Sequence, residues 1–167
     1  SNTASSQGGG VYLLGSAADT ERFVNVLFAA NQSGAAGAAL YANHSDGDDT
    51  LTLLYTTVAS PTVATGSAIY IANGTAVITD TIITSHTIGI QQAGGTATQN
   101  YNLFFGNTSN IAGTVGGGTG QVNANPLFVN PAAVNYHLAA GSPAVDAGID
   151  TGVTIDFDGD VRPQIGG

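Results

Sequence analysis

Phe23-Val24-Asn25-Val26-Leu27-Phe28-Ala29-Ala30-Asn31 is the stretch that decides the fold, because variants of it return along the chain. Related runs lie at 50–55, 77–83 and 99–105, and each carries a polar side chain at the place of Asn25. These polar positions are separated by 27, 28 and 22 residues: Asn25, Thr52, Asp80 and Asn102. A repeat of this length is typical of solenoids, in which each repeat forms one coil.

A second landmark repeats beside the first. Gly8-Gly9-Gly10-Val11-Tyr12 has counterparts at 37–41 and 66–70, which end in Tyr41 and Tyr70 and recur at offsets of 29 and 29 residues. Two independent patterns therefore give a similar period. We expect equivalent residues of successive coils to lie above one another, with the three tyrosines in one column.

The composition of the repeats favours short strands. Val, Ile, Leu, Thr, Tyr and Phe dominate the runs, apolar positions alternate within them, and glycines interrupt every candidate helix. The sequence predicts an all-β protein, a parallel β-helix of four to five coils over 1–120. An irregular C-terminal extension over 121–167 is expected to pack on the same solenoid as part of a single domain. The glycine-rich residues 109–120 are expected to form a loop without strands.

The repeat also predicts which side chains share a column. The polar column Asn25, Thr52, Asp80 and Asn102 is expected at a turn, where backbone N–H groups satisfy the Asp80 carboxylate. The column Phe28, Tyr55, Ile83 and Phe105 is expected in the core.

Composition limits the classes of function. The chain has 167 residues, of which 8% are charged, and a net charge of −9. This charge argues against binding to nucleic acid or to an anionic membrane surface. Cysteine is absent, which excludes disulfides and thiolate metal sites. No run is long and apolar enough to predict membrane insertion.

The C-terminal part carries a set of short motifs. They are Asn125-Pro126-Leu127-Phe128, Tyr136-His137-Leu138, Gly141-Ser142-Pro143-Ala144-Val145-Asp146-Ala147-Gly148 and Asp156-Phe157-Asp158-Gly159-Asp160-Val161-Arg162-Pro163. This part resembles the C-terminal portion of secreted bacterial right-handed parallel β-helix proteins of the pectate-lyase-like superfamily. The upstream repeats look like the coils of polymorphic outer-membrane proteins. The resemblance implies a right-handed solenoid and an extracellular or cell-surface location, and it implies no particular activity.

Asp156, Asp158 and Asp160 are the candidate metal ligands. Alternating carboxylates in a loop suit a hard cation such as calcium, although Gly159 and the missing Glu exclude an EF-hand. The alternative is that these aspartates form turns and pair with Arg162. No other cofactor is predicted.

No catalytic residue is predicted. The other acidic residues fall on scattered turns: Asp19, Glu21, Asp46, Asp48, Asp49 and Asp80. Glycosidases need paired carboxylates, and Arg22 beside Glu21 reads as a surface pair. His86 and His137 are expected to face solvent, and Ser142 does not lie in a nucleophile elbow.

Two functions are compatible with these observations. The first is a non-enzymatic structural protein of the cell surface: a scaffold, adhesin segment or filament subunit that self-associates end to end. It rests on the expectation that the chain begins in mid-coil, which leaves strand edges open. The second is a β-helix that binds or cleaves carbohydrate, for example surface glycans, through the tyrosine column with Asp46, Asp48 or Asp80.

Overall fold

A computed structural model describes residues 1–15, 20–44 and 49–162, apart from the side chain of Pro61. This part contains strands, one 3₁₀ turn and no α-helix. The elements in order are β1 (Thr3–Ala4), β2 (Val11–Gly15), β3 (Thr20–Val24), β4 (Leu27–Ala29), β5 (Gln32–Ser33), β6 (Leu40–His44), β7 (Thr50–Leu54), β8 (Thr57–Asn73), β9 (Thr75–Thr79), β10 (Ile82–Gln92), β11 (Thr96–Asn100), β12 (Leu103–Phe105), β13 (Ser109–Ala112), β14 (Val115–Gly117), β15 (Val122–Asn123), β16 (Phe128–Asn130), η1 (Pro131–Ala133) and β17 (Asn135–Leu138).

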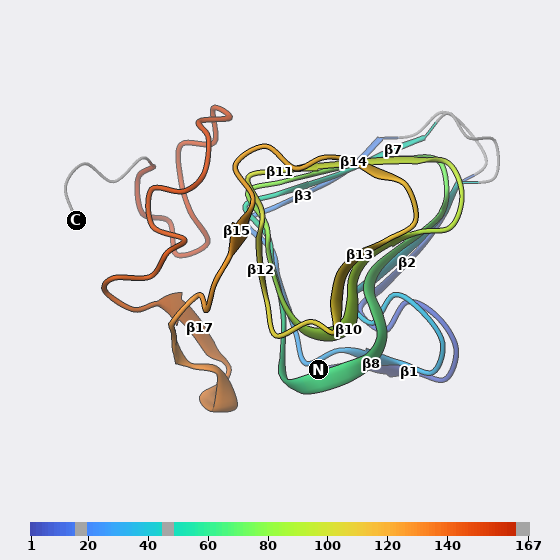
Figure 1. The fold of residues 1–167 in the computed structure, drawn as a ribbon, viewed down its shortest axis with the longest axis horizontal. Helices are drawn as coiled ribbons and strands as arrows, with labels where there is room; N and C mark the ends of the chain where they lie inside the picture. Colours follow the sequence, from blue (N-terminus) through green and yellow to red (C-terminus); the bar gives the residue numbers. More distant parts are fainter. Residues whose placement is uncertain (16–19, 45–48, 163–167) are drawn as a thin grey trace.

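The strands stack as a parallel β-solenoid of about four turns, which confirms the predicted fold. One sheet has the order β15-β12-β10-β8-β6-β2, with β4 and β13 pairing beside it, and the other has the order β14-β11-β9-β7-β3. The long strands β8 and β10 turn a corner, so each contributes to two faces of the coil. Figure 1 looks along the stack and shows the coils as a rounded triangle.

The 29-residue landmark is confirmed. Tyr12 pairs with Tyr41, and Tyr41 with Tyr70, on β2, β6 and β8. The preceding glycines lie one above another with left-handed φ angles of 66°, 67° and 79°: Gly8, Gly37 and Gly66. A side chain is strained at such a φ, and a Cβ on Gly37 would lie 2.5 Å from the Leu40 carbonyl oxygen.

The predicted polar column is wrong in two of its four members. The residues that share the corner before the next strand are Asn25, Tyr55, Asp80 and Tyr101, with φ angles of 55°, 47°, 49° and 54°. Thr52 lies within β7 opposite Arg22. Asn102 lies one residue past the corner, fully buried beside Thr81. The predicted turn location of Asn25 and Asp80 is correct.

The predicted core column also needs correction. Phe28 pairs with Val58, Val58 with Ile83, and Ile83 with Phe104, and all four side chains are buried. Phe105 is 41% exposed, and Tyr55 lies at the corner. The left-handed corner residue interrupts the alternation that the sequence pattern assumed, because alternation holds only within one extended strand.

The expectation of a strandless loop at 109–120 is wrong. β13 pairs with β10, and β14 pairs with β11, so the solenoid continues through these residues and ends with β15 on β12. Glycine-rich sequence is tolerated here because the strands lie at the end of the stack, where β14 has one partner.

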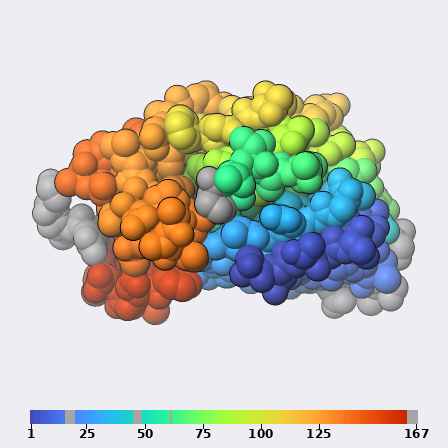
Figure 2. All heavy atoms as spheres, turned by 90° about the horizontal axis from the view of Figure 1, so that it is seen from below, coloured from blue at the N-terminus to red at the C-terminus, as the bar shows by residue number. Residues whose placement is uncertain are grey.

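The C-terminal residues form a tail beside the solenoid. The antiparallel hairpin β16–β17, with η1 between its strands, begins the tail. Figure 1 shows the tail (orange to red) next to the triangle and outside the coils, and Figure 2 shows it on one side of the molecule.

Candidate functional site

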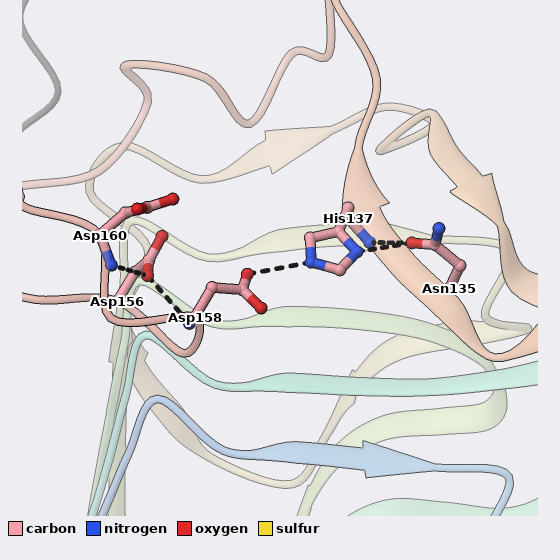
Figure 3. Close-up of polar contacts among 5 residues, drawn as sticks. All are labelled: Asn135, His137, Asp156, Asp158 and Asp160. Atoms are coloured by element: carbon pink, nitrogen blue, oxygen red, sulfur yellow. Dashed lines mark hydrogen bonds and ion pairs between the residues drawn. The ribbon is translucent and has the colours of Figure 1, made fainter.

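The three predicted metal ligands lie in an exposed loop of the tail (Figure 3). The Asp156 Oδ1 atom accepts the backbone N–H groups of Asp158 and Asp160, both at 2.9 Å. The Asp158 carboxylate points away from the other two, toward His137. Asp156 thus closes a turn through its own backbone neighbours, as Asp side chains commonly do.

Within 1–15, 20–44 and 49–162, no group of three or more His, Cys, Asp or Glu side chains is arranged to hold a metal ion. Calcium binding by Asp156, Asp158 and Asp160 therefore stays a prediction. The turn-forming alternative agrees with the hydrogen bonds of Asp156. Its expected partner Arg162 lies instead over the Tyr55 ring, 4.3 Å from the ring centroid.

His137 joins the hairpin to this loop. Its Nε2 atom lies 2.9 Å from Asp158 Oδ2, and its Nδ1 atom lies 2.6 Å from Asn135 Oδ1. The Asn135 oxygen also accepts the His137 backbone N–H, which fixes the orientation of the amide. The imidazole side chain is 62% exposed, so the prediction that it faces solvent is confirmed. An exposed side-chain contact of this kind positions the loop and stabilises it only weakly.

The corner residues of three successive coils hold the tail. Asn25 Nδ2 donates to the Ile155 carbonyl oxygen at 2.8 Å, and the Tyr55 hydroxyl donates to the Ile149 carbonyl oxygen at 2.6 Å. Asp80 Oδ1 accepts the Ile149 N–H at 2.9 Å. The left-handed conformation at this corner therefore turns all three side chains toward the tail.

Burial raises the pKa of Asp80 above its usual range. The hydrogen bond that the Ile149 N–H donates and the positive charge of Arg162 both lower the pKa of Asp80, but their effects are smaller than the effect of burial. Its second oxygen, Oδ2, is buried without a hydrogen-bond partner among the described residues. The desolvated carboxylate is tolerated at this position because the tail supplies a hydrogen-bond donor, the Ile149 N–H, and a nearby cation, Arg162.

We expect Tyr55→Phe to loosen the tail and leave the solenoid intact. The change removes one hydrogen bond, worth about 1 kcal/mol, and keeps the ring under Arg162. Hydrogen exchange of the amides at 149–162 should become faster, while exchange in β7 and β9 stays the same. Tyr101→Phe, in the same corner column, is the matched control. Equal exchange rates in the wild type and Tyr55→Phe would contradict this role.

The tyrosine column forms a stacked ladder. The ring centroids of Tyr12 and Tyr41 are 5.0 Å apart, those of Tyr41 and Tyr70 are 5.1 Å apart, and the planes are within 5° of parallel. Burial raises the pKa of Tyr41, and the neighbouring tyrosines raise it further. Because stacked neighbours occupy both faces of the middle ring, the ladder favours packing over sugar binding. Asp80, a predicted companion of the ladder, contacts the tail at a different corner.

Two histidines are buried. His86 is 1% exposed, so the expectation that it faces solvent is wrong. Its backbone is fixed by Asn107, whose Oδ1 accepts the His86 N–H at 3.0 Å. His44 is also fully buried, with its Nε2 atom 3.5 Å from Glu21 Oε2. The predicted pairing of Glu21 with Arg22 is thus replaced by a cross-coil contact with His44.

A network of amides at the C-terminal end of the solenoid was not predicted as a unit. Gln99 Nε2 donates to Gln121 Oε1 (2.9 Å), and Gln121 Nε2 donates to Asn123 Oδ1 (3.1 Å). Asn110 Nδ2 donates to the same Asn123 oxygen (2.8 Å), and Asn102 Nδ2 donates to Gln99 Oε1 (3.0 Å). Asn123 pairs with Phe104, so the core column of Phe28 ends in an amide. The signal was the concentration of Asn and Gln after residue 98.

The remaining acidic candidates are Asp19, Asp46, Asp48 and Asp49. Asp19, Asp46 and Asp48 lie outside the described residues. Asp49 is fully buried, and its Oδ2 lies where a Cβ on Gly15 would have to be. The Ser142 hydroxyl accepts the Ala144 N–H at 3.2 Å and so closes a turn, in agreement with a structural role.

Comparison with known proteins found no matching family model, no matching curated protein and no matching solved structure. The fold therefore defines the class: the chain is a parallel β-solenoid protein with a side-docked tail. Across the described residues, no helix is long and apolar enough to cross a membrane.

Proposed function

We propose that this chain is a non-enzymatic structural protein, a rigid β-solenoid scaffold of the cell surface or extracellular space. The resemblance to secreted bacterial β-helix proteins supports the location. The structural role is supported by the polar side chains of the coils, which form hydrogen bonds with backbone groups and with one another. Asn102, for example, accepts the Thr81 N–H and donates to the Ile78 carbonyl oxygen, both at 2.8 Å.

The observation that carries the proposal is the difference between the two ends of the solenoid. The C-terminal coil ends in the amide network of Gln99, Gln121 and Asn123. The N-terminal coil has the edge strands β2 and β3, and four of its apolar side chains are only partly buried against the core: Val11, Leu13, Phe23 and Val26. Among the described residues of the C-terminal end, only Val115 on β14 is partly buried in this way. A polar outer face is what a capping repeat needs, whereas an open apolar edge pairs readily with another strand.

We propose that two copies join end to end through this N-terminal edge. A contact between identical faces is isologous and closes as a pair. Extension into a filament would also require a contact through the C-terminal end, which the amide network covers. This contact should be weaker than the one through the N-terminal edge, because it requires the amides to lose their water. The amide network thus disfavours assembly through the C-terminal end of the solenoid.

Sedimentation velocity over a range of protein concentrations tests this proposal. We expect a concentration-dependent shift from monomer to dimer, and Leu14→Lys should oppose it, because a lysine on an edge strand disfavours pairing. Leu14 is 68% exposed, and the matched control is Val63→Lys, at a site 58% exposed on the inner strand β8. Monomer at every concentration would contradict self-association.

Hydrogen exchange measured with and without a chelator tests the calcium prediction for Asp156, Asp158 and Asp160. If these three residues bind calcium, hydrogen exchange in the tail should change when the chelator removes the metal.

A further inference from the structure

A cleft of about 570 Å³ lies between the tail and the solenoid. Ser60 on β8, Thr84 on β10 and Phe105 on β12 form the solenoid wall, and Leu127, Phe128 and Tyr136 form the tail wall. Figure 2 shows the hairpin (orange) beside the β8 segment near residue 60 (green). The volume falls within the range of about 300–1,000 Å³ that is usual for small-molecule sites.

The walls of the cleft keep apolar side chains in contact with water. Phe105 and Leu127 are each 41% exposed, and they face the cleft from opposite sides of the boundary between tail and solenoid. Phe128 packs edge-to-face on Tyr136, with ring centroids 5.1 Å apart and an interplanar angle of 87°. An aromatic pair held in this way gives a rigid apolar wall.

The tail wall is held in shape by its own hydrogen bonds. Leu127 has a φ angle of 52°, a conformation that is costly for a bulky residue. The Asn125 side chain supports it, because Oδ1 accepts the Leu127 N–H at 3.0 Å. The cleft is therefore formed before any ligand arrives, which reduces the entropy cost of binding.

The polar groups of the cleft are uncharged. Ser60 and Thr84 provide buried hydroxyls on the solenoid side, and Ser85 adds a partly exposed one. Among the described residues, the Tyr136 hydroxyl is buried without a hydrogen-bond partner. Within the part of the chain that the structure describes, no Asp, Glu, Lys, Arg or His lines the cleft, and the whole chain carries a net charge of −9. An anionic ligand would find no cation here and would be repelled by the protein as a whole.

We infer that this cleft binds a neutral saccharide. A sugar without carboxylates presents apolar C–H faces, which suit Phe105 and Phe128, and hydroxyls, which suit Ser60, Thr84 and Ser85. The site is distinct from the tyrosine ladder, whose inner ring faces are already stacked. It is also independent of end-to-end association, because none of its lining residues lies on β2 or β3.

Isothermal titration calorimetry of the full chain tests the inference, with cellotetraose and maltotetraose as neutral probes and tetragalacturonate as an anionic probe of the same length. We expect binding of a neutral probe and none of the anion. Phe105→Ala should weaken that binding about ten-fold, because it removes one aromatic wall. Phe157→Ala, at an aromatic residue 65% exposed outside the cleft, should bind like the wild type.

Failure of both neutral probes to bind would overturn the inference, as would preference for the anion or unchanged affinity in Phe105→Ala. A second readout needs no variant. The aromatic proton resonances of Phe105, Phe128 and Tyr136 should shift on addition of the neutral sugar, while those of Tyr12 and Phe157 stay in place. Shifts confined to Tyr12 would move binding to the ladder and reject the cleft.

Discussion

Phe104→Ala should lower the free energy of unfolding by about 3–5 kcal/mol, the range for truncating a buried phenylalanine. Phe104 is 1% exposed and forms the last apolar layer of the column Phe28, Val58, Ile83 and Phe104. The cavity would open directly beneath the paired residue Asn123, so an amide would border an empty apolar space. Chemical denaturation, followed by far-ultraviolet circular dichroism, measures the change.

Phe105→Ala is the matched control for this prediction. The two residues are neighbours in β12, but the Phe105 side chain is 41% exposed. Its truncation should therefore cost less than about 1 kcal/mol, as for most exposed positions. The opposite result, a large loss for Phe105→Ala and a small one for Phe104→Ala, would show that β12 faces the other way and would reject the register described above.

Acidification from pH 6.5 to pH 4 should destabilise the protein by up to about 3 kcal/mol through His86 alone, since one pKa unit corresponds to about 1.36 kcal/mol. Burial lowers the pKa of His86 from 6.5 to about 4, against a smaller opposing effect of a hydrogen bond to the Thr84 backbone. The ring Nδ1 atom is buried without a partner among the described residues, so a second N–H would have no acceptor.

The direction of the pH effect depends on whether the folded or the unfolded state binds the proton at the higher pH. Below pH 6.5 the unfolded chain takes up a proton at residue 86, whereas the folded protein does so only near pH 4. Stability therefore falls as the pH is lowered through this interval. Asp80 acts in the opposite direction, because its raised pKa makes its protonation favour the folded state.

Thermal unfolding measured between pH 7 and pH 4 tests this prediction. In an Asp80→Asn background, which removes the opposing carboxylate, His86→Gln should flatten the loss of stability on acidification. His137→Gln is the matched control at an exposed histidine, and the pH dependence should survive it because His86 remains. An equal slope with and without His86 would contradict the assignment.

The sequence alone determined the solenoid and part of its register. The Gly-Val-Tyr landmark predicted the column of Tyr12, Tyr41 and Tyr70, because a glycine at a left-handed turn and a large aromatic residue recur at equal spacing. The strand composition predicted an all-β fold without helices. These features depend on local conformation and on the period of the repeat, which one sequence is enough to reveal.

Tertiary structure decided where each side chain points after a corner. A single left-handed residue, such as Tyr55 or Asp80, breaks the alternation, so Phe104 lies inside where the pattern placed Phe105. The burial of His86 depends on the coils above and below it. The geometry of the corners decides which residues of neighbouring coils lie beside one another, and the period of the repeat does not specify that geometry.

The tail shows the same limit. Its motifs were visible in the sequence, but its contacts with Asn25, Tyr55 and Asp80 join residues 69 to 130 positions apart. No local pattern specifies such pairs. The cleft between tail and solenoid is lined by residues far apart in the sequence, such as Phe105 and Leu127, so the folded chain alone determines it.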